Sequence, residues 1–241
     1  MAAIKRMVNF EAEAERARDG VCVAYDLVGF SQFFNQPDIH SYIPAYLNHI
    51  IQSIETCLFG GDGFWKAEAE RIVPPLSLQP AHRSFMGDGG LYVWAPDESR
   101  QITPDFVTTL MSRLCDLRNS FRKITKDCEE FIPVADLPRA IRFAVTRGSV
   151  FELASTGASE KEYIGVGINL ATRLLKYCAG LDFVGASRLN PPKATLETLG
   201  LRKVVAVKLT DFSREIVLVS KTEFAALDPA IRQNLFEELQ D

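Results

Sequence analysis

Apolar residues follow two periods along this chain, one typical of strands and the other of helices. A valine-rich run over 21–28 predicts a buried strand that carries Asp26 near its end. Apolar residues three and four positions apart predict helices over 41–59, 104–124 and 167–177. Shorter apolar runs predict further strands over 84–86, 91–94, 140–145, 149–153, 181–184, 203–208 and 215–219.

Turn-forming residues separate these elements. Gly87-Asp88-Gly89-Gly90 predicts a tight hairpin between the strands on either side of it. Arg147-Gly148 predicts a second turn, which leads into the strand over 149–153. Three prolines among mixed charges indicate an insertion or loop over 64–80, and small polar residues indicate a flexible loop over 155–160.

The order of the elements predicts a single α+β domain over residues 1–241. A central, mainly antiparallel sheet with flanking helices accommodates this order of strands and helices. The core of the domain is expected over about residues 20–220. A charged helix over 1–19 and a tail over 221–241, with a short helix and a solvated end, are expected as extensions.

Composition and charge narrow the class of protein. The 241 residues carry a net charge of −4, so no basic surface indicates nucleic acid as a partner. No apolar run approaches the ~18 residues of a membrane span, and no signal peptide is evident, so we expect a cytoplasmic protein. The five cysteines include no CxxC pair and share no zinc-ligand spacing with the three histidines, which favours free thiols in a reducing compartment.

Two aspartates are the first candidates for chemistry. Asp26 ends a buried strand, where a carboxylate is costly unless it is paired or bound to a metal. Asp88 lies in the Gly-Asp-Gly-Gly turn, where an aspartate alone is equally typical of an ordinary hairpin. Two carboxylates on neighbouring strands can hold two divalent cations, and oxygen ligands suit Mg²⁺ or Mn²⁺.

Two further features suggest a phosphate-bearing substrate. Asn169 and Arg173 are four residues apart on a predicted helix and share a face, so they can orient a sugar and donate to a phosphate. A solvated polar face is the alternative. Gly29 and Phe30 follow the strand of Asp26, where backbone N–H groups at a helix start can cradle a phosphate or simply turn the chain.

Four segments, in order, carry a resemblance to a known family. They are Asp26-Leu27-Val28-Gly29-Phe30-Ser31, Met86-Gly87-Asp88-Gly89, the stretch from Ile141 to Gly148 and the stretch from Tyr163 to Leu174. Together they resemble the class III nucleotidyl cyclase catalytic domain over about residues 20–220. The resemblance implies a ferredoxin-like sheet with extra strands. It also implies a head-to-tail homodimer with active sites at the subunit interface.

The resemblance also implies a reaction and roles for residues. The ribose 3′-hydroxyl of a nucleoside triphosphate attacks the α-phosphate, and pyrophosphate leaves. Asp26, Asp88 and the backbone carbonyl of Leu27 would hold two Mg²⁺ or Mn²⁺ ions per site. The partner subunit would supply Asn169 and Arg173.

A lysine late in the chain is implied to contact the terminal phosphates. Lys208 matches it, but Leu209 stands where the family often has glycine, and an edge-strand lysine is the alternative.

Two positions that read the base in this family depart from its pattern. Ser84, four residues before Asp88, replaces the lysine of ATP-using members and the glutamate of GTP-using members. Glu162, seven residues before Asn169, replaces the usual aspartate, threonine or cysteine. A hydroxyl and an acceptor suit UTP or CTP, and also the amino group of adenine.

The chain also resembles the short stand-alone pyrimidine cyclases of bacterial anti-phage signalling, the Pycsar systems. This resemblance favours UTP, then CTP, and implies a separate effector that responds to the cyclic nucleotide without direct contact. An ordinary adenylate cyclase and a catalytically silent regulatory module are the alternatives.

Overall fold

The computed structural model describes residues 16–60, 64–67, 69–97, 99–132, 136–153, 161–210, 212 and 214–239. The strands are β1 Arg18–Val28, β2 Phe64–Ala67, β3 Ala69–Ile72, β4 His82–Phe85, β5 Gly89–Trp94, β6 Ala140–Leu153, β7 Glu162–Gly165, β8 Phe183–Ala186, β9 Leu201–Val207, β10 Arg214–Ser220 and β11 Phe236–Glu238. The helices are α1 Phe30–Phe34, α2 Ile43–Phe59, α3 Pro104–Glu129, α4 Val166–Leu175, α5 Lys193–Thr198, α6 Lys221–Ala226 and α7 Pro229–Leu235. Short 3-10 helices are η2 Ile39–Ser41, η3 Lys176–Cys178 and η4 Ser187–Leu189.

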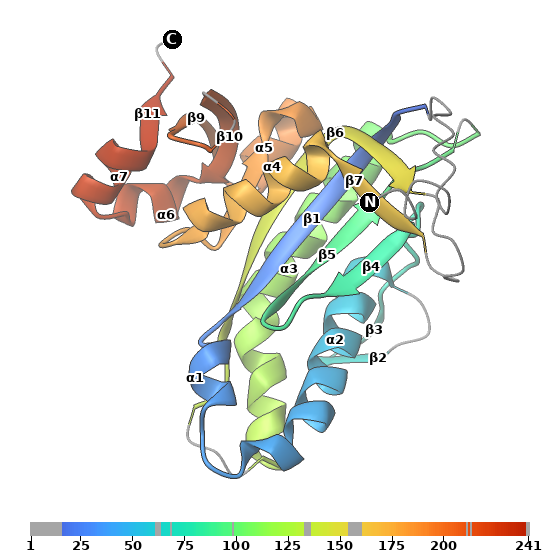
Figure 1. The fold of residues 1–241 in the computed structure, drawn as a ribbon, viewed down its shortest axis with the longest axis vertical. Coiled ribbons are helices and arrows are strands. Elements are labelled where there is room, and N and C mark those ends of the chain that lie inside the picture. Colours follow the sequence, from blue (N-terminus) through green and yellow to red (C-terminus); the bar gives the residue numbers. More distant parts are fainter. Residues whose placement is uncertain are drawn as a thin grey trace, which may run out of the picture.

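A nine-stranded sheet forms the centre of the molecule (Figure 1). Its strand order is β11-β9-β10-β8-β6-β1-β5-β4, and β7 pairs with β6 beside this path. The pairs are antiparallel except β6 with β8, which is parallel. The predicted α+β architecture, with a mainly antiparallel sheet and flanking helices, is therefore confirmed.

Helices cover the two faces of this sheet unequally. Alternate β1 residues Val21, Val23, Tyr25 and Leu27 belong to the large core that α2 and α3 complete. Cys22 and Ala24 point to the other face, where Ala171 of α4 packs. In Figure 1, α2 and α3 lie behind the sheet and α4 lies over one end of β1. Of the described helices, none crosses this second face at the end of β1 that carries Asp26.

The predicted break between residues 145 and 149 is wrong, because β6 continues through it. Gly148 pairs with Gly20 of β1 and does not turn the chain. A Cβ atom at Gly148 would lie 3.2 Å from the backbone nitrogen of Gly167. The glycine is therefore needed for the close approach of α4 to the sheet, which a single sequence cannot distinguish from a turn.

Both ends of the chain also differ from the prediction. Arg18 and Asp19, expected at the end of a helix over 1–19, already belong to β1 and pair with β6, while residues 1–15 lie outside the described residues. The tail contains a strand that was not predicted, because β11 pairs with β9, but its last described residues, Glu237, Glu238 and Leu239, are exposed as expected. Phe236 of β11 is buried, with its ring 5.7 Å from Tyr177 and 5.5 Å from Phe224.

The remaining elements follow the periodic signals closely. The helices predicted over 41–59, 104–124 and 167–177 correspond to α2, α3 and α4, and α3 continues to Glu129. The segment expected as an insertion or loop contains the separate hairpin β2–β3. The short elements β7 and α5 were not predicted, and the loop predicted over 155–160 lies outside the described residues. All five cysteines are free, as expected.

Candidate active site

The predicted hairpin between β4 and β5 is confirmed, and each of its glycines has a steric reason. The backbone N–H of Met86 donates to the carbonyl oxygen of Gly89 over 2.7 Å. Gly87 has φ of +89°, which suits the first central position of a type II′ turn. A Cβ atom at Gly89 would overlap the carbonyl oxygen of Tyr25 on β1. The turn can therefore lie close against β1 only because this position has no side chain.

This hairpin brings the two candidate aspartates together. Asp26 on β1 pairs directly with Gly89, the residue that follows Asp88. The backbone N–H of Leu27 donates to the carbonyl oxygen of Asp88 over 2.7 Å, which fixes the turn against β1. The two aspartates, 62 positions apart in sequence, thus lie on neighbouring backbone segments at the uncovered end of the sheet, near enough to interact electrostatically.

The surroundings of Asp26 influence its pKa in opposite directions. Burial raises the pKa of Asp26, and the nearby carboxylate of Asp88 raises it further. The guanidinium of Arg142 lowers the same pKa, but its influence is smaller than the other two. A cation bound beside Asp26 and Asp88 would remove the repulsion that the Asp88 carboxylate exerts on Asp26.

Next to the aspartates, the chain turns sharply from β1 into α1. Gly29 has φ of +88°, a left-handed conformation that favours glycine, and a Cβ atom there would meet nothing within 4 Å. Phe30 and Phe33 anchor α1 in the core. No described side chain caps the first turn of α1, so backbone N–H groups in that turn stay available to another acceptor.

The predicted polar pair lies on α4. Leu170, Ala171 and Leu174 of this helix are buried against the sheet. Asn169 and Arg173 share the outer flank of the helix, with Asn169 exposed and Arg173 half-buried. Within one protomer, this pair therefore faces away from the sheet that carries Asp26.

Lys208 lies outside the strand that the sequence predicted for it. β9 ends at Val207, and Lys208 follows with φ of +61° and an exposed side chain. β9 is also not an edge strand, because it lies between β10 and β11. The Lys208 ammonium donates to the Oδ1 atom of Asn234 on α7.

The two predicted base-reading residues lie on different strands. Ser84 is half-buried on β4 and pairs with Leu91, whose side chain belongs to the same face as Cys22 and Ala24 of β1. Ser84 therefore shares the face on which Asp26 lies. Glu162 is exposed at the first position of β7, opposite Leu153.

Comparisons with known proteins establish the architecture. No protein-family model and no curated protein sequence matches the chain. The adenylyl cyclase CyaB from P. aeruginosa matches with a TM-score of 0.63 at 15% identity, over 86% of this chain and 95% of that one. The guanylyl cyclase Cya2 matches with a TM-score of 0.58 at 17% identity, over 86% of this chain and 93% of that one. The guanylate cyclase domain of RhGC from Catenaria anguillulae, in complex with GTP, matches with a TM-score of 0.56 at 12% identity, over 84% and 96%.

The chain has the class III cyclase fold. At 12–17% identity, the likeness concerns the path of the backbone and leaves the chemistry to the residues themselves. None of the described helices is long and apolar enough to cross a bilayer.

On this cyclase fold, the candidate site offers few protein ligands for a metal. Among the described residues, no three His, Cys, Asp or Glu side chains gather closely enough to hold an ion. Asp26, Asp88 and the backbone carbonyl of Leu27 are the oxygen donors at hand. Mg²⁺ commonly takes one or two carboxylates and completes its shell with water and substrate phosphates. The donor set therefore fits Mg²⁺ or Mn²⁺ held jointly with a polyphosphate.

Arg142 is a residue of this site that the sequence reasoning did not single out. It lies on β6 directly opposite Asp26, so the two side chains share one face of the sheet. Its Nε atom is buried and has no hydrogen-bond partner among the described residues. The alternation of Arg142 with Ile141 and Phe143 indicated a side chain on the opposite face from the core. Its position beside Asp26 depends on a strand register that no local pattern contains.

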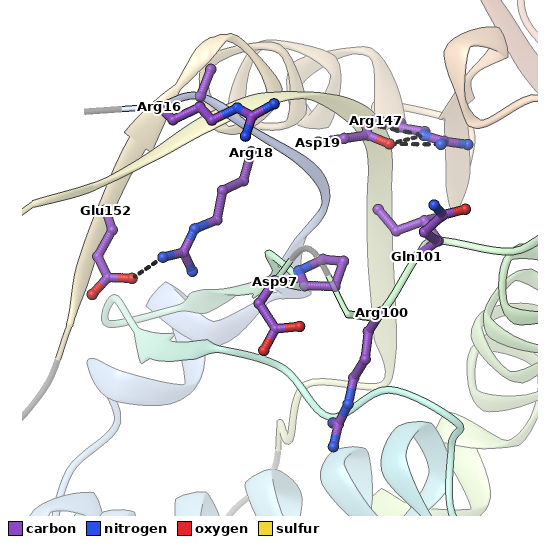
Figure 2. A pocket seen from close by; sticks show the side chains of 11 residues that line it. Arg16, Arg18, Asp19, Asp97, Arg100, Gln101, Arg147 and Glu152 are labelled. Carbon is purple, nitrogen blue, oxygen red and sulfur yellow. Dashed lines mark hydrogen bonds and ion pairs between the residues drawn. The ribbon is translucent and has the colours of Figure 1, made fainter. Parts of the chain in front are cut away.

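A cavity of about 900 Å³ lies elsewhere on this fold (Figure 2). It is bounded by the start of β1, the segment after β5 and the far half of β6, and none of its lining residues was predicted as a site residue. Asp19, which lines it, precedes Asp26 by seven residues, or roughly 23 Å of extended strand. The aspartate pair therefore lies on an open face of the protomer and outside this cavity.

Proposed function

We propose that this protein is a nucleotide cyclase that converts a nucleoside triphosphate to its 3′,5′-cyclic monophosphate and pyrophosphate. The ribose 3′-oxygen loses its proton to solvent water and bonds to the α-phosphorus, while the bond from that phosphorus to the bridging oxygen of the β-phosphate breaks and pyrophosphate leaves. The observation that carries this proposal is the meeting of Asp26 and Asp88 on the uncovered face of a class III cyclase fold.

Asp26, Asp88 and the Leu27 carbonyl would hold two Mg²⁺ or Mn²⁺ ions. Ions bound there would supply Lewis-acid chemistry, which would lower the pKa of the attacking hydroxyl and offset charge on the leaving pyrophosphate. The uncapped first turn of α1, at Gly29 and Phe30, offers N–H donors to the phosphates.

The guanidinium of Arg142, close to Asp26, favours the same substrate. Arg142 shares the face of Asp26, and its buried Nε donor lacks a partner that a phosphate oxygen would supply. Lys208 would reach the terminal phosphates only after it leaves Asn234.

We propose that the site is completed by a second copy of the chain in a head-to-tail homodimer. Asn169 and Arg173 lie on the outer flank of α4, where they can meet a substrate that is held by another protomer. In that arrangement Asn169 orients the ribose, and Arg173 donates to the α-phosphate as negative charge develops.

We propose UTP as the preferred substrate, CTP next and ATP third. Ser84 lies on the same face as Asp26, and the neighbouring Met86 is 54% exposed, so a small polar group and an apolar side chain flank the place for the base. Ser84 and Glu162 offer hydrogen bonds that a pyrimidine can complete, and no lysine or glutamate is present at position 84 to read a purine. The product would act in the cytoplasm on a separate effector during anti-phage signalling.

The deciding experiment is a product assay with each of the four nucleoside triphosphates and Mn²⁺, read by mass spectrometry. We expect cyclic UMP as the main product. Asp26→Ala and Asp88→Ala should each abolish turnover while the unfolding temperature stays close to that of the wild type. Cyclic AMP as the main product would contradict the pyrimidine assignment, and full activity in both variants would contradict the metal assignment.

A mixing experiment tests the shared site. Asp88→Ala and Arg173→Ala are each expected to be inactive alone. A mixture of the two should recover about a quarter of wild-type activity, because half of the dimers form at random as heterodimers with one intact site of two. Absence of recovery, with dimers confirmed by light scattering, would contradict the composite site.

A further inference from the structure

Two adjoining cavities lie at the end of the sheet opposite the aspartate pair. Their volumes are about 900 and 290 Å³, and they share Arg18, Pro96, Asp97 and Arg100 as lining residues. Figure 2 shows the lining of the larger one. Volumes of a few hundred to a thousand Å³ are typical of small-molecule sites. The larger cavity therefore has room for a ligand of nucleotide size.

The charges that line these cavities are not balanced. The cationic residues are Arg16, Arg18, Arg100, Arg147 and Lys161, and the anionic residues are Asp19, Asp97 and Glu152. This local excess of positive charge belongs to a chain whose net charge is −4. A concave surface of the opposite sign to the whole molecule concentrates anions.

Among the described residues, the ion pairs around Glu152 occupy only part of the donor capacity of the cavity. Glu152 accepts from Arg18 over 3.1 Å and from Lys161 over 2.7 Å, so one carboxylate serves two cations. The Oδ1 atom of Asp97 accepts hydrogen bonds from the backbone N–H of Ser99, over 3.0 Å, and from the Ser99 hydroxyl. A guanidinium carries five N–H donors, and among the described residues Arg18 forms an ion pair through one nitrogen, Nη2, with Glu152.

We propose that these cavities form a second binding site, for a small phosphate-bearing anion such as a nucleotide. The anion contacts the guanidinium of Arg18, and Arg100 and Lys161, which also line the cavities, supply further positive charge. Because the site is roughly 23 Å along β1 from Asp26, a ligand there does not occupy the catalytic face. The inference does not depend on the proposed cyclase reaction, and β1 connects the two sites directly.

The site is best tested in a variant that cannot convert the nucleotide to product. The Asp26→Ala, Asp88→Ala double variant is titrated with UTP in EDTA by calorimetry, so that metal-dependent binding at the catalytic face is absent. We expect saturable UTP binding, competition by inorganic pyrophosphate and no binding of uridine. Uridine binding without pyrophosphate competition would overturn the phosphate chemistry, and no UTP binding at all would overturn the site.

Substitutions then locate the bound anion. Arg18→Gln and Arg100→Gln, each added to the double variant, should weaken UTP binding by about tenfold or more, as expected for loss of a charged hydrogen bond. Arg139→Gln changes an exposed arginine immediately before the start of β6, far from the cavities; it is the matched control and should leave affinity unchanged. Arg100 lies in an exposed loop, so we expect Arg100→Gln to fold normally. It can therefore test the site even if Arg18→Gln fails to fold. Unchanged affinity in both variants, or loss of binding on Arg173→Ala, would assign the anion to another place.

Discussion

Replacing Gly89 by alanine tests the geometry on which the aspartate pair depends. A Cβ atom at this position would overlap the Tyr25 carbonyl oxygen and lie 3.1 Å from the Cα atom of Asp26. The obstacle is the backbone of β1, which is paired on both sides and cannot move aside as a flexible side chain would. Normal van der Waals separation therefore requires the hairpin to move by about 1 Å.

That displacement carries Asp88 with it. Leu27 holds the Asp88 carbonyl over 2.7 Å, and this hydrogen bond lengthens or breaks when the turn moves. Overpacking of this kind costs about 1–3 kcal/mol of unfolding free energy. A misplacement of about 1 Å in a catalytic group lowers the rate by roughly a hundredfold. We expect both effects in Gly89→Ala, together with weaker Mn²⁺ binding by the nucleotide complex.

Gly87→Ala in the same turn is the matched control. Its φ of +89° makes alanine strained by roughly 1–2 kcal/mol, but a Cβ atom there would meet nothing within 4 Å. Urea unfolding and kcat measured side by side should show comparable destabilisation in the two variants and a much larger loss of kcat in Gly89→Ala. Equal rates in the two variants would refute the argument that the contact with β1 sets the position of Asp88.

Three further substitutions test other parts of the structure. Because the folded-state pKa of Asp26 is raised, its protonated form stabilises the fold at low pH, and this stabilisation is lost as the pH rises through that pKa. At pH 7, Asp26→Asn should therefore unfold at a higher urea concentration than the metal-free wild type. From about pH 4 upward, its urea midpoint should also depend less on pH than that of the wild type. Arg142→Met should raise KM for the triphosphate about tenfold or more, while Arg139→Met should not. Phe236→Ala should lower the unfolding free energy by about 3–5 kcal/mol, because it removes the buried ring that anchors β11.

The sequence predicts best those elements that have a strong period of their own. The apolar stripes of α2 and α3 and the valine-rich run of β1 are each long enough to be recognised without their neighbours. The hairpin at Gly87-Asp88 is also a local signal, because its φ > 0 position demands glycine. The meeting of Asp26 with Asp88 follows once these two strands are placed side by side.

The errors arise where a residue serves a distant contact. Arg147-Gly148 has the residue types of a turn, but Gly148 is needed for the packing of α4. Nothing within ten residues of Gly148 indicates this packing role. Phe236 lies near a polar chain end, yet it is buried by Tyr177 and Phe224 from elsewhere in the fold. Arg142 gains its place beside Asp26 only through the register of β6 against β1.

The open face of the sheet links the proposed catalytic role to the need for a partner. One protomer packs α2 and α3 over one face of the sheet to form the large core, but on the second face α4 covers only part of β1 (Figure 1). A substrate held by Asp26 and Asp88 there would leave its ribose and α-phosphate in water, where charge development is poorly stabilised. The outward position of Asn169 and Arg173 on α4 supplies the missing donors if a second copy covers this face. Dilution should therefore reduce activity more steeply than in proportion to enzyme concentration, and strict proportionality below the dimer dissociation constant would exclude a shared site.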